Sequence, residues 1–326
     1  MSHTDHHAKP SLLYRLRSYL SKRLDPGALP LIHAAEAEKL AEVVQVLEQR
    51  LDSGEPFLPR IIHLETRSRC NGHCSFCLAS VDNDPRDDEL MPQALVDKVL
   101  HELSALAYPY RLSMYSNNEP LMDKRIYDFV TQARSQLPKA YLEIKTNGTS
   151  LTMEKIYKLF DNGLDILYVN DYRPSADVEA GEHRANVAKI KQELKGIRRF
   201  KGHYGGGRYS DRIIITLRKQ DDALYNRAGT APNAVQIRQP LHAPCLRPFE
   251  MMTINAKGEV GLCSDDVLFS THMGNVNNNS LMEIWRSAEY NTIRRSLLKG
   301  DRSCKSACNA CDNKGHTWEI FKELGV

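Results

Sequence analysis

Residues 61–77 read IIHLETRSRCNGHCSFC, which is a short apolar strand that runs directly into a group of cysteines. The cysteines have the spacing C-x3-C-x2-C and are Cys70, Cys74 and Cys77. Three thiolates so close together on one loop can bind three irons of a [4Fe–4S] cluster and leave the fourth iron open. A tetrahedral zinc site would need a fourth protein ligand, which His63 or His73 could supply. The spacing therefore favours an iron–sulfur cluster, with zinc as the alternative.

Strands and helices alternate in the chain that follows this loop. Apolar runs typical of strands occur at residues 61–65, 111–115, 141–145, 164–169 and 212–217. Helical spacing of apolar residues occurs between them, at residues 95–106, 124–136, 153–160 and 178–200. Such alternation predicts βαβ units, and hence a parallel sheet with right-handed crossovers.

Polar loops follow several of these expected strands. The second strand leads into Asn117-Asn118-Glu119-Pro120, the third into Thr146-Asn147-Gly148 and the fourth into Asn170-Asp171. Arg218 lies just past the fifth strand. Because the carboxyl ends of parallel strands meet at one edge of the sheet, we expect these residues on the same rim as the first cysteines.

The cysteine loop and the rim residues together resemble the radical S-adenosylmethionine (radical SAM) enzymes. The family signature is a C-x3-C-x-aromatic-C loop after the first strand, and Phe76 stands at the aromatic position. The loop from Asn117 to Pro120 is similar to the family's GGEP loop, whose polar backbone and Glu hold the amino group of SAM. Two Asn replace the usual Gly residues, and Asn tolerates left-handed backbone. The resemblance implies SAM contacts from Phe76, Asn117, Asn118, Glu119, Pro120, Asn147 and Asn170.

A second group of cysteines lies near the end of the sequence. Cys245 and Cys263 bracket a β-hairpin expected at residues 249–262, and Cys308 and Cys311 follow further on. This arrangement resembles the SPASM or twitch extension of radical SAM enzymes, which binds auxiliary iron–sulfur clusters. Only 15 residues follow Cys311 and none is Cys, so the resemblance implies the shorter twitch version. It implies one auxiliary [4Fe–4S] cluster with four cysteine ligands, although four thiolates can also bind zinc.

Cys304 is left over from these two sets. It forms a second C-x3-C-x2-C run with Cys308 and Cys311, but almost no chain follows that could build a barrel, and Ala310 takes the aromatic position. Two interpretations stay open for Cys304. It is an idle thiol or alternative cluster ligand, or it is the hydrogen-atom donor of the kind that radical SAM epimerases use.

The resemblance implies an α/β fold, with a partial (β/α)5–6 radical SAM barrel followed by a small twitch or SPASM-like cluster-binding domain. The expected domains are an N-terminal helical extension at residues 1–56, the barrel at 57–240 and the cluster domain at 241–326. Further helices are expected at residues 11–20, 33–51 and 281–298. Five strands precede the expected hairpin. This is one fewer than the usual six, so the closing edge of the barrel stays unassigned.

In the mechanism that this resemblance implies, a reduced cluster cleaves SAM, and a 5′-deoxyadenosyl radical abstracts hydrogen from an unactivated carbon. An auxiliary cluster can then accept an electron from the deprotonated substrate radical, which completes an alcohol oxidation. The expected enzyme is an oxidoreductase for a small polar metabolite of the sugar or aminocyclitol class, served by a flavodoxin- or ferredoxin-type electron donor. The sequence does not choose among the candidates for the substrate base, which include Asp171, Arg173, Arg218, Lys219, Asp265 and Asp266.

Two other functions stay open. The first is a radical SAM epimerase of an aminoglycoside or a peptide, with Cys304 as its hydrogen donor. The second is a zinc- or cluster-bearing binding protein without radical chemistry. The two radical enzymes differ in the fate of the substrate radical, which loses an electron in the oxidoreductase and gains a hydrogen atom in the epimerase.

The composition excludes several other classes. Lys and Arg total 44 against 41 Asp and Glu, and a formal charge of +3 is too small to predict nucleic acid binding. No apolar run reaches the length of a transmembrane helix, and the opening residues MSHTDHHAKP lack the apolar segment of a secretory signal. These features predict a cytoplasmic protein. In that compartment, clustered cysteines are metal ligands or catalytic groups before they are disulfides.

Overall fold

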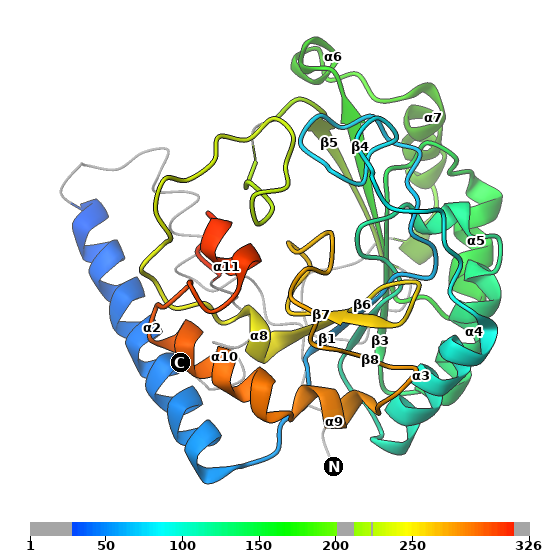
Figure 1. Ribbon diagram of the computed structural model, residues 1–326. Helices are drawn as coiled ribbons and strands as arrows, with labels where there is room; N and C mark the ends of the chain where they lie inside the picture. Colours follow the sequence, from blue (N-terminus) through cyan, green and yellow to red (C-terminus); the bar gives the residue numbers. More distant parts are fainter. Residues whose placement is uncertain (1–27, 201–211, 223, 316–326) are drawn as a thin grey trace. The chain divides into compact units, whose positions relative to one another are not determined.

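The computed structural model describes residues 28–200, 212–222 and 224–315 (Figure 1). The helix expected at residues 11–20 lies outside these ranges. The chain forms two compact units. The first contributes helix α2 (Ala28–Ser53), which includes the helix expected at 33–51. The second contains the described residues from 57 onward, and both cysteine groups belong to it.

The second unit is built on one sheet with the strand order β5-β4-β3-β2-β1-β6-β7-β8. Neighbours from β5 to β6 are parallel, whereas β7 and β8 are added antiparallel. The parallel strands are β1 (Ile61–Leu64), β2 (Arg111–Ser113), β3 (Tyr141–Thr146), β4 (Ile166–Arg173), β5 (Arg212–Lys219) and β6 (Met251–Ile254). The last two are β7 (Glu259–Gly261) and β8 (Gly274–Asn275). The expected α/β class is confirmed.

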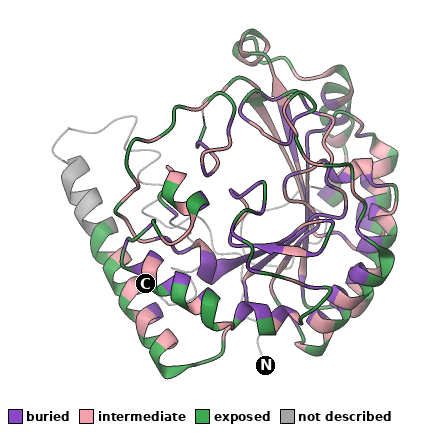
Figure 2. Ribbon diagram, in the orientation of Figure 1, coloured by how far each residue is buried: buried purple, intermediate pink, exposed green. Residues whose placement is uncertain are grey.

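Helices connect the parallel strands and cover one face of the sheet (Figure 1). They are α3 (Gln93–Ala105), α4 (Ile126–Gln136), α5 (Met153–Asp161) and α7 (Ala185–Leu194). The covered face is apolar, because Ile62, Leu112 and Leu142 are neighbours across β1, β2 and β3 and all three are fully buried. Figure 2 shows this burial along the strands. Burying this face stabilises the sheet and fixes its register.

The opposite face of the same strands carries polar side chains. Side chains alternate along a strand, so His63, Ser113 and Glu143, each one residue after a member of the apolar row, form a polar row on this opposite face. Ser113 donates a hydrogen bond of 2.9 Å to Glu143, and all three residues are buried. Lys145 of β3 pairs with Tyr168 of β4, and its ammonium lies 5.2 Å from the centre of that ring. This face of the sheet therefore accommodates polar groups.

The sixth parallel strand comes from the segment in which the sequence predicts only a hairpin. β6 pairs with β1 in parallel, with Met252 opposite Ile62, and then turns into β7. Its sequence MMTI is buried throughout, which is typical of a strand inside a parallel sheet. The sheet therefore has six parallel strands, the upper end of the expected five to six, and the strand that the sequence left unassigned follows Cys245 in the chain.

Two helices expected to be continuous are broken. Residues 178–200 contain the end of α6 (Ser175–Glu179), then α7 and the 3-10 turn η2 (Arg198–Phe200). The break occurs where Gly181 has a φ of +74°, which a helix does not allow. Residues 281–298 divide into α9 (Leu281–Trp285) and α10 (Ala288–Leu298), because the side chain of Ser287 caps α10 by accepting from the Tyr290 amide.

Candidate active site

The first three cysteines lie on the loop that leaves β1. A Cβ atom placed on Gly72 would lie 3.4 Å from Cys70 Sγ and 3.9 Å from Cys74 Sγ, so the two sulfurs approach the same point. Burial raises the pKa of Cys70 to about 11 and that of Cys74 to about 12. Thiolates in such a loop need positive charge nearby, which bound iron supplies. The donors of this loop therefore fit an iron–sulfur cluster.

A lone zinc ion fits these side chains less well. Within the described ranges, no three His, Cys, Asp or Glu side chains are placed to bind a single metal ion. His63 Nδ1 donates to the Tyr115 carbonyl at 3.3 Å, and His73 Nδ1 lies 2.9 Å from Asp82 Oδ2. Both candidate fourth ligands are thus engaged elsewhere. Cysteines that bind different irons of one cluster do not have to converge on one point.

The carboxylate of Glu119 holds the loops after β2 and β3 together. It accepts hydrogen bonds from Thr146 Oγ1 and the Asn147 amide, each at 2.7 Å, and from the Leu121 amide at 3.1 Å. Burial raises the pKa of Glu119. Pro120 then begins the 3-10 turn η1 (Pro120–Met122). Three protein donors therefore occupy the carboxylate for which the sequence predicts a SAM contact.

Asn117 and Asn118, which replace the glycines of the family's loop, use their side chains differently. Arg227 donates to the Oδ1 atom of the buried Asn117, and Arg86 donates to its carbonyl at 2.7 Å. Asn118 Oδ1 accepts from the Ser116 amide at 2.9 Å, whereas its Nδ2 is buried without a hydrogen-bond partner among the described residues. An unmatched buried donor destabilises the protein unless a ligand or water pairs with it. Asn118 Nδ2 is therefore available to a ligand oxygen.

Asn147 connects the loop after β3 to the cysteine loop. Its Nδ2 donates to Asn71 Oδ1 at 2.8 Å and lies 3.7 Å from Cys70 Sγ. On the next two strands, Arg218 Nε donates to Asn170 Oδ1 at 3.1 Å. The structure thus brings Asn147 to the cysteines, and it brings Asn170 and Arg218 to each other.

Phe76 places the cysteine loop beside the end of β4. Its ring packs on Tyr172 with the ring centres 5.4 Å apart, and Tyr172 pairs with Arg218 across β4 and β5. The aromatic position of the cysteine loop therefore lies near the residues that end β4 and β5. This agrees with the predicted common rim.

Asp171 lies in β4 next to Asn170 but contacts the segment before α7. Its carboxylate is fully buried and accepts hydrogen bonds from His183 Nδ1 at 3.0 Å and from the Arg184 amide at 2.8 Å. These contacts anchor the loop that leads into α7. Because neighbouring residues of a strand point to opposite faces, Asp171 is directed away from the Asn170–Arg218 pair.

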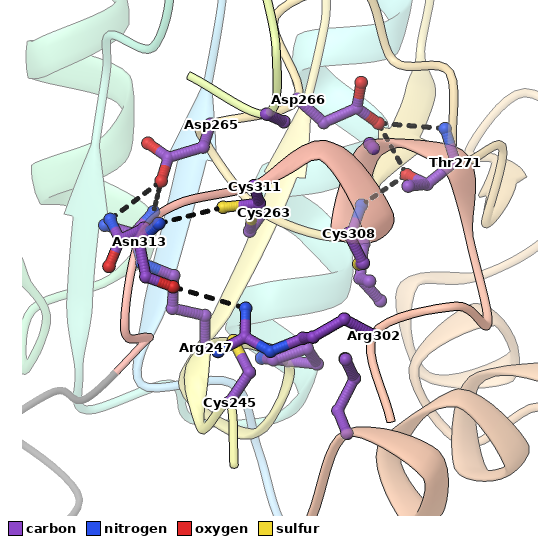
Figure 3. Close-up of a pocket in the computed structure, with 15 residues that line it drawn as sticks. Cys245, Arg247, Cys263, Asp265, Asp266, Thr271, Arg302, Cys308, Cys311 and Asn313 are labelled. Atoms are coloured by element: carbon purple, nitrogen blue, oxygen red, sulfur yellow. Dashed lines mark hydrogen bonds and ion pairs between the residues drawn. The ribbon is translucent and has the colours of Figure 1, made fainter. Parts of the chain in front are cut away.

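The four cysteines expected in the auxiliary set line one cavity (Figure 3). Cys245 precedes α8 (Arg247–Glu250), Cys263 follows β7, and Cys308 and Cys311 lie on and directly after α11 (Ser306–Ala310). The empty space in the cavity is about 390 Å³, including the part that is open to solvent. Segments that are far apart in the sequence therefore bring these four sulfurs together.

The buried guanidinium of Arg302 and the partly buried guanidinium of Arg247 line the same cavity (Figure 3). Arg247 Nη1 lies 2.9 Å from Asp265 Oδ2, and Arg247 also hydrogen-bonds to Cys263. Arg302 Nη1 donates to the Asn313 carbonyl at 3.2 Å. Burial and Asp265 raise the pKa of Cys263 to about 12, while Arg247 acts in the opposite direction. Four soft thiol donors beside two cations fit the anionic ligand set of a [4Fe–4S] cluster.

Asp265 and Asp266, considered as bases, are both engaged with the protein. Asp265 Oδ2 accepts from Asn313 Nδ2 at 2.9 Å in addition to its ion pair with Arg247. Asp266 Oδ2 accepts from the Thr271 amide at 2.9 Å and from the Thr271 hydroxyl at 2.7 Å. These carboxylates support the wall of the cavity.

Cys304 is not one of the residues that line this cavity. It hydrogen-bonds to Cys308, which lowers the pKa of Cys304 to about 7 and raises that of Cys308. Cys304 is partly exposed. The structure therefore gathers the four expected cysteines and places the eighth cysteine of the chain beside one of them.

Several site residues are not marked by the sequence patterns. Arg247 and Arg302 are ordinary charged residues in the sequence, although Arg247 follows a cysteine ligand closely, and this proximity is the available signal. Lys145 ends an expected strand, and strand alternation could have placed it on the polar face. Burial opposes its charge, but Tyr115 and Glu143 raise the pKa of Lys145.

Comparison with known proteins places the two halves of this site in known families. The model of the Radical SAM superfamily matches residues 64–203, which include the first cysteine loop. The chain therefore contains a radical SAM domain. The model of the iron–sulfur cluster-binding domain SPASM matches residues 245–312, which include all four cysteines of the cavity.

Relatives of this radical SAM protein include an oxidoreductase. The S-adenosyl-L-methionine-dependent 2-deoxy-scyllo-inosamine dehydrogenase of Niallia circulans is 28% identical over 254 residues, which cover 78% of this chain and 92% of that protein. A tungsten-containing aldehyde ferredoxin oxidoreductase cofactor-modifying protein of Pyrococcus furiosus is 28% identical over 167 residues, 50% of this chain and 45% of that protein.

Solved structures share the fold of this radical SAM protein. BtrN in complex with AdoMet and 2-DOIA superimposes with a TM-score of 0.65 at 24% identity, covering 81% of this chain and 98% of that chain. The anSMEcpe protein with bound AdoMet gives a TM-score of 0.51 at 12% identity, covering 82% of this chain and 93% of that chain. The predicted radical SAM barrel fold is therefore confirmed.

The expectations of an enzyme and of its cofactors are also confirmed. The radical SAM domain and the iron–sulfur cluster-binding domain make the protein an enzyme that uses SAM and [4Fe–4S] clusters. In the part of the chain that the structure describes, no helix has the length and apolar character needed to cross a membrane.

Proposed function

We propose that this radical SAM protein oxidises a hydroxyl group of a small polar metabolite of the sugar or aminocyclitol class. The observation that carries the proposal is the cavity in which four cysteines meet the buried Arg302 and the partly buried Arg247 (Figure 3). Four thiolates complete the coordination of a [4Fe–4S] cluster, so a cluster held there suits electron transfer. The dehydrogenase named among the relatives supports the same reaction class. The ligands would be Cys245, Cys263, Cys308 and Cys311.

The first cluster would be bound by Cys70, Cys74 and Cys77. When bound, this cluster and SAM supply the radical that abstracts hydrogen from the substrate. The chain's own contribution is to position SAM. Because protein donors hold the Glu119 carboxylate, we assign the contact with the SAM amino group to the backbone of its loop, and the contact with a SAM oxygen to Asn118 Nδ2. The rest of the SAM pocket would be formed by Phe76, Asn117, Pro120, Asn147 and Asn170.

Arg218 and Asn170 are the proposed contacts of the substrate hydroxyl. They are hydrogen-bonded to each other, and the neighbouring Tyr172 packs on the cysteine loop. A guanidinium beside a hydroxyl favours its deprotonated form and fixes the oxygen in place. The oxidation removes a hydrogen atom from carbon, a proton from oxygen, which would pass to solvent, and an electron, which the auxiliary cluster would accept. Arg218 would thus help the proton to leave before the electron does.

The polar face of the sheet supports a substrate rich in oxygen or nitrogen. His63, Ser113 and Glu143 are buried there in one row, and Lys145 lies between the rings of Tyr115 and Tyr168. Buried polar groups of this kind are stable only when they find hydrogen-bond partners. Ser113 pairs with Glu143 and His63 with the Tyr115 carbonyl, so the face is polar before any substrate binds, and it suits hydroxyl and amino groups better than an apolar substrate.

The proposed reaction also needs an external reductant and a suitable compartment. A one-electron donor of the flavodoxin or ferredoxin type would reduce the first cluster before SAM is cleaved. We propose the cytoplasm as the location, because seven thiol ligands must remain reduced until clusters are inserted.

The experiment is anaerobic reconstitution with iron and sulfide, followed by reduction with dithionite in the presence of SAM. The wild-type protein should hold about eight irons in two clusters, cleave SAM, and convert 2-deoxy-scyllo-inosamine or a related aminocyclitol or sugar to a ketone. A Cys263→Ala variant should hold about four irons, still cleave SAM, and form no ketone. About four irons in the wild type, or no cleavage of SAM, would contradict the proposal.

The alternative is an epimerase of an aminoglycoside or a peptide, in which Cys304 returns a hydrogen atom to the substrate radical. The partly exposed thiol outside the cluster cavity is the feature that favours it. We expect a Cys304→Ala variant to keep about eight irons and its ketone-forming activity. Loss of turnover in this variant, together with carbon-bound deuterium in products formed in deuterated water, would establish the epimerase instead.

A further inference from the structure

A strained turn from Asn226 to Gly229 lies next to the auxiliary cavity. Arg227 has a φ of +51°, Ala228 of +54° and Gly229 of +83°, so three consecutive residues are left-handed. Residues other than glycine avoid this region, and they remain in it only where surrounding contacts hold them there. Such conformations occur often at functional sites, so the contacts that this turn makes are candidates for a functional role.

The turn is fixed to the segment that carries the last two cluster ligands. Asn226 Nδ2 donates to the Ala310 carbonyl at 2.6 Å, and the Asn226 amide donates to Asp312 Oδ1 at 2.8 Å. A Cβ atom on Gly229 would lie only 2.9 Å from Ala310 Cβ, so glycine is required for this close approach. The backbone of the turn is therefore set by its contacts with the auxiliary site.

The side chain of Arg227 reaches from this turn to the loop after β2. Its Nη2 atom donates to Asn117 Oδ1 and also to the Ser264 carbonyl at 3.1 Å. Its Nε atom is buried without a hydrogen-bond partner among the described residues, and it lies 3.9 Å from Asp265 Oδ1. One guanidinium thus contacts both the loop assigned to SAM and the loop that follows Cys263.

The contacts continue on both sides of Arg227. Asp265 Oδ2 lies 2.9 Å from Arg247 Nη1, and Arg247 hydrogen-bonds to the auxiliary cysteine Cys263. On the other side, the Asn117 amide donates to Glu65 Oε2 at 2.9 Å. A continuous series of polar contacts therefore runs from the loop after β2 to the auxiliary cysteines, with Arg227 at its centre.

We propose that Arg227 is a positioning residue that ties the SAM-binding loop to the auxiliary-cluster loop, so that SAM binding depends on contacts made at the auxiliary site. The inference rests on the proposed function in assigning the loop of Asn117 to SAM. It also accounts for the departure of this loop from the family's pattern, because a glycine at position 117 would offer no side-chain oxygen to Arg227.

The test is a double-mutant cycle on SAM affinity, measured by equilibrium dialysis with the reconstituted protein and without substrate. Arg227→Met and Asn117→Gly should each weaken SAM binding about tenfold, the loss expected for one charged hydrogen bond. The double variant should bind no more than about twofold more weakly than either single variant, because both changes remove the same contact. Arg227→Lys, which keeps a charged donor, should recover part of the affinity.

The control variant is Arg238→Met, which removes an exposed arginine of the same segment and should leave SAM affinity unchanged. Iron content near eight in every variant shows that both clusters are still bound. SAM binding by the wild type tests the proposed function, whereas the ratios of SAM affinity between variants test the positioning role of Arg227. Additive losses in the double variant, or unchanged affinity in Arg227→Met or in Asn117→Gly, would overturn the proposal.

Discussion

At the scale of single residues, Arg247 controls the charge beside the auxiliary cysteines. It is held by Asp265 at 2.9 Å and hydrogen-bonds to Cys263. Hydrogen bonds and positive charge next to a thiolate cluster raise its reduction potential, because reduction adds negative charge. We therefore expect Arg247→Met to lower the potential of the auxiliary cluster and to slow substrate oxidation while SAM cleavage continues. The reduction potential of the auxiliary cluster is measured by a redox titration that is monitored by electron paramagnetic resonance.

The control for Arg247→Met is a double variant in which the ion-pair partner Asp265 is also replaced. Arg247→Met leaves the buried Asp265 without its nearer cation, with Arg227 still 3.9 Å away, and this loss destabilises the site independently of the cluster. The double variant Arg247→Met/Asp265→Asn removes that side effect and separates it from the potential. Arg247→Lys keeps the charge and should stay near the wild-type potential. A potential that is unchanged or higher in Arg247→Met would show that its charge does not act on the cluster.

The sequence predicts the residues of the site better than it predicts their partners. Seven cysteine ligands can be proposed from it, because ligand spacing is local and each group lies beside an expected strand or hairpin. The partner of Asn117 could not be predicted, since Arg227 lies 110 positions further along the chain. The role of Glu119 was only partly predictable. Its loop is recognisable, but two of the donors that hold its carboxylate come from the loop of another strand.

At the scale of elements, the turn after β3 depends on Gly148. Its φ is +74°, and a Cβ atom there would lie 2.9 Å from Val169 Cγ1 and 3.1 Å from Val187 Cγ2. Gly148→Ala should therefore combine backbone strain of about 1–2 kcal/mol with overpacking of about 1–3 kcal/mol. The free energy of unfolding, measured by urea titration under anaerobic conditions, should fall by the sum of the two.

Gly181 provides a matched control for this prediction. Its φ is also +74°, but no atom lies within 4 Å of the position that a Cβ would take. Gly181→Ala should therefore show the backbone strain alone, about 1–2 kcal/mol. Equal losses in the two variants would mean that the packing of Val169 and Val187 against the turn does not limit the residue at position 148.

Elements are predictable from the sequence where their periodicity is local. The strands at β3 and β5 and the helices α3, α4 and α5 lie close to their expected positions, because apolar residues repeat with the period of the element. β6 was recognisable only as half of a hairpin, since its pairing with β1 joins segments far apart in the sequence. The break between α9 and α10 depends on Ser287, whose capping role a periodicity of apolar residues does not reveal.

At the scale of the larger unit, the segment with the auxiliary cysteines shares its sheet and its core with the barrel. β6 is the neighbour of β1, and the fully buried Arg294 of α10 donates to the Pro248 carbonyl at 2.9 Å. The same guanidinium lies 4.0 Å from the centre of the Trp285 ring, which in turn packs on Phe57. The radical SAM barrel and the SPASM segment should therefore unfold together.

Global stability should depend on pH through the buried His63 of β1. Burial, together with Lys145, Arg111 and Arg247, lowers the pKa of His63 from 6.5 to about 3. Between these values the unfolded chain binds a proton that the folded protein does not. Stability should therefore fall as the pH falls below about 6.5, by up to about 1.4 kcal/mol per pH unit from this one group.

The measurement is the free energy of unfolding at pH values from 7 to about 5.5, obtained by anaerobic urea titration. His63→Gln cannot take up the proton, so its stability should decrease less steeply with pH than that of the wild type, even if its stability at neutral pH is lower. The matched control is His101→Gln, which replaces an exposed histidine of α3 and should keep the wild-type slope. Equal slopes in His63→Gln and the wild type would show that His63 takes up its proton equally in both states. Burial and the three cations Lys145, Arg111 and Arg247 would then not hold it neutral against the Tyr115 carbonyl, whose hydrogen bond raises the pKa of His63.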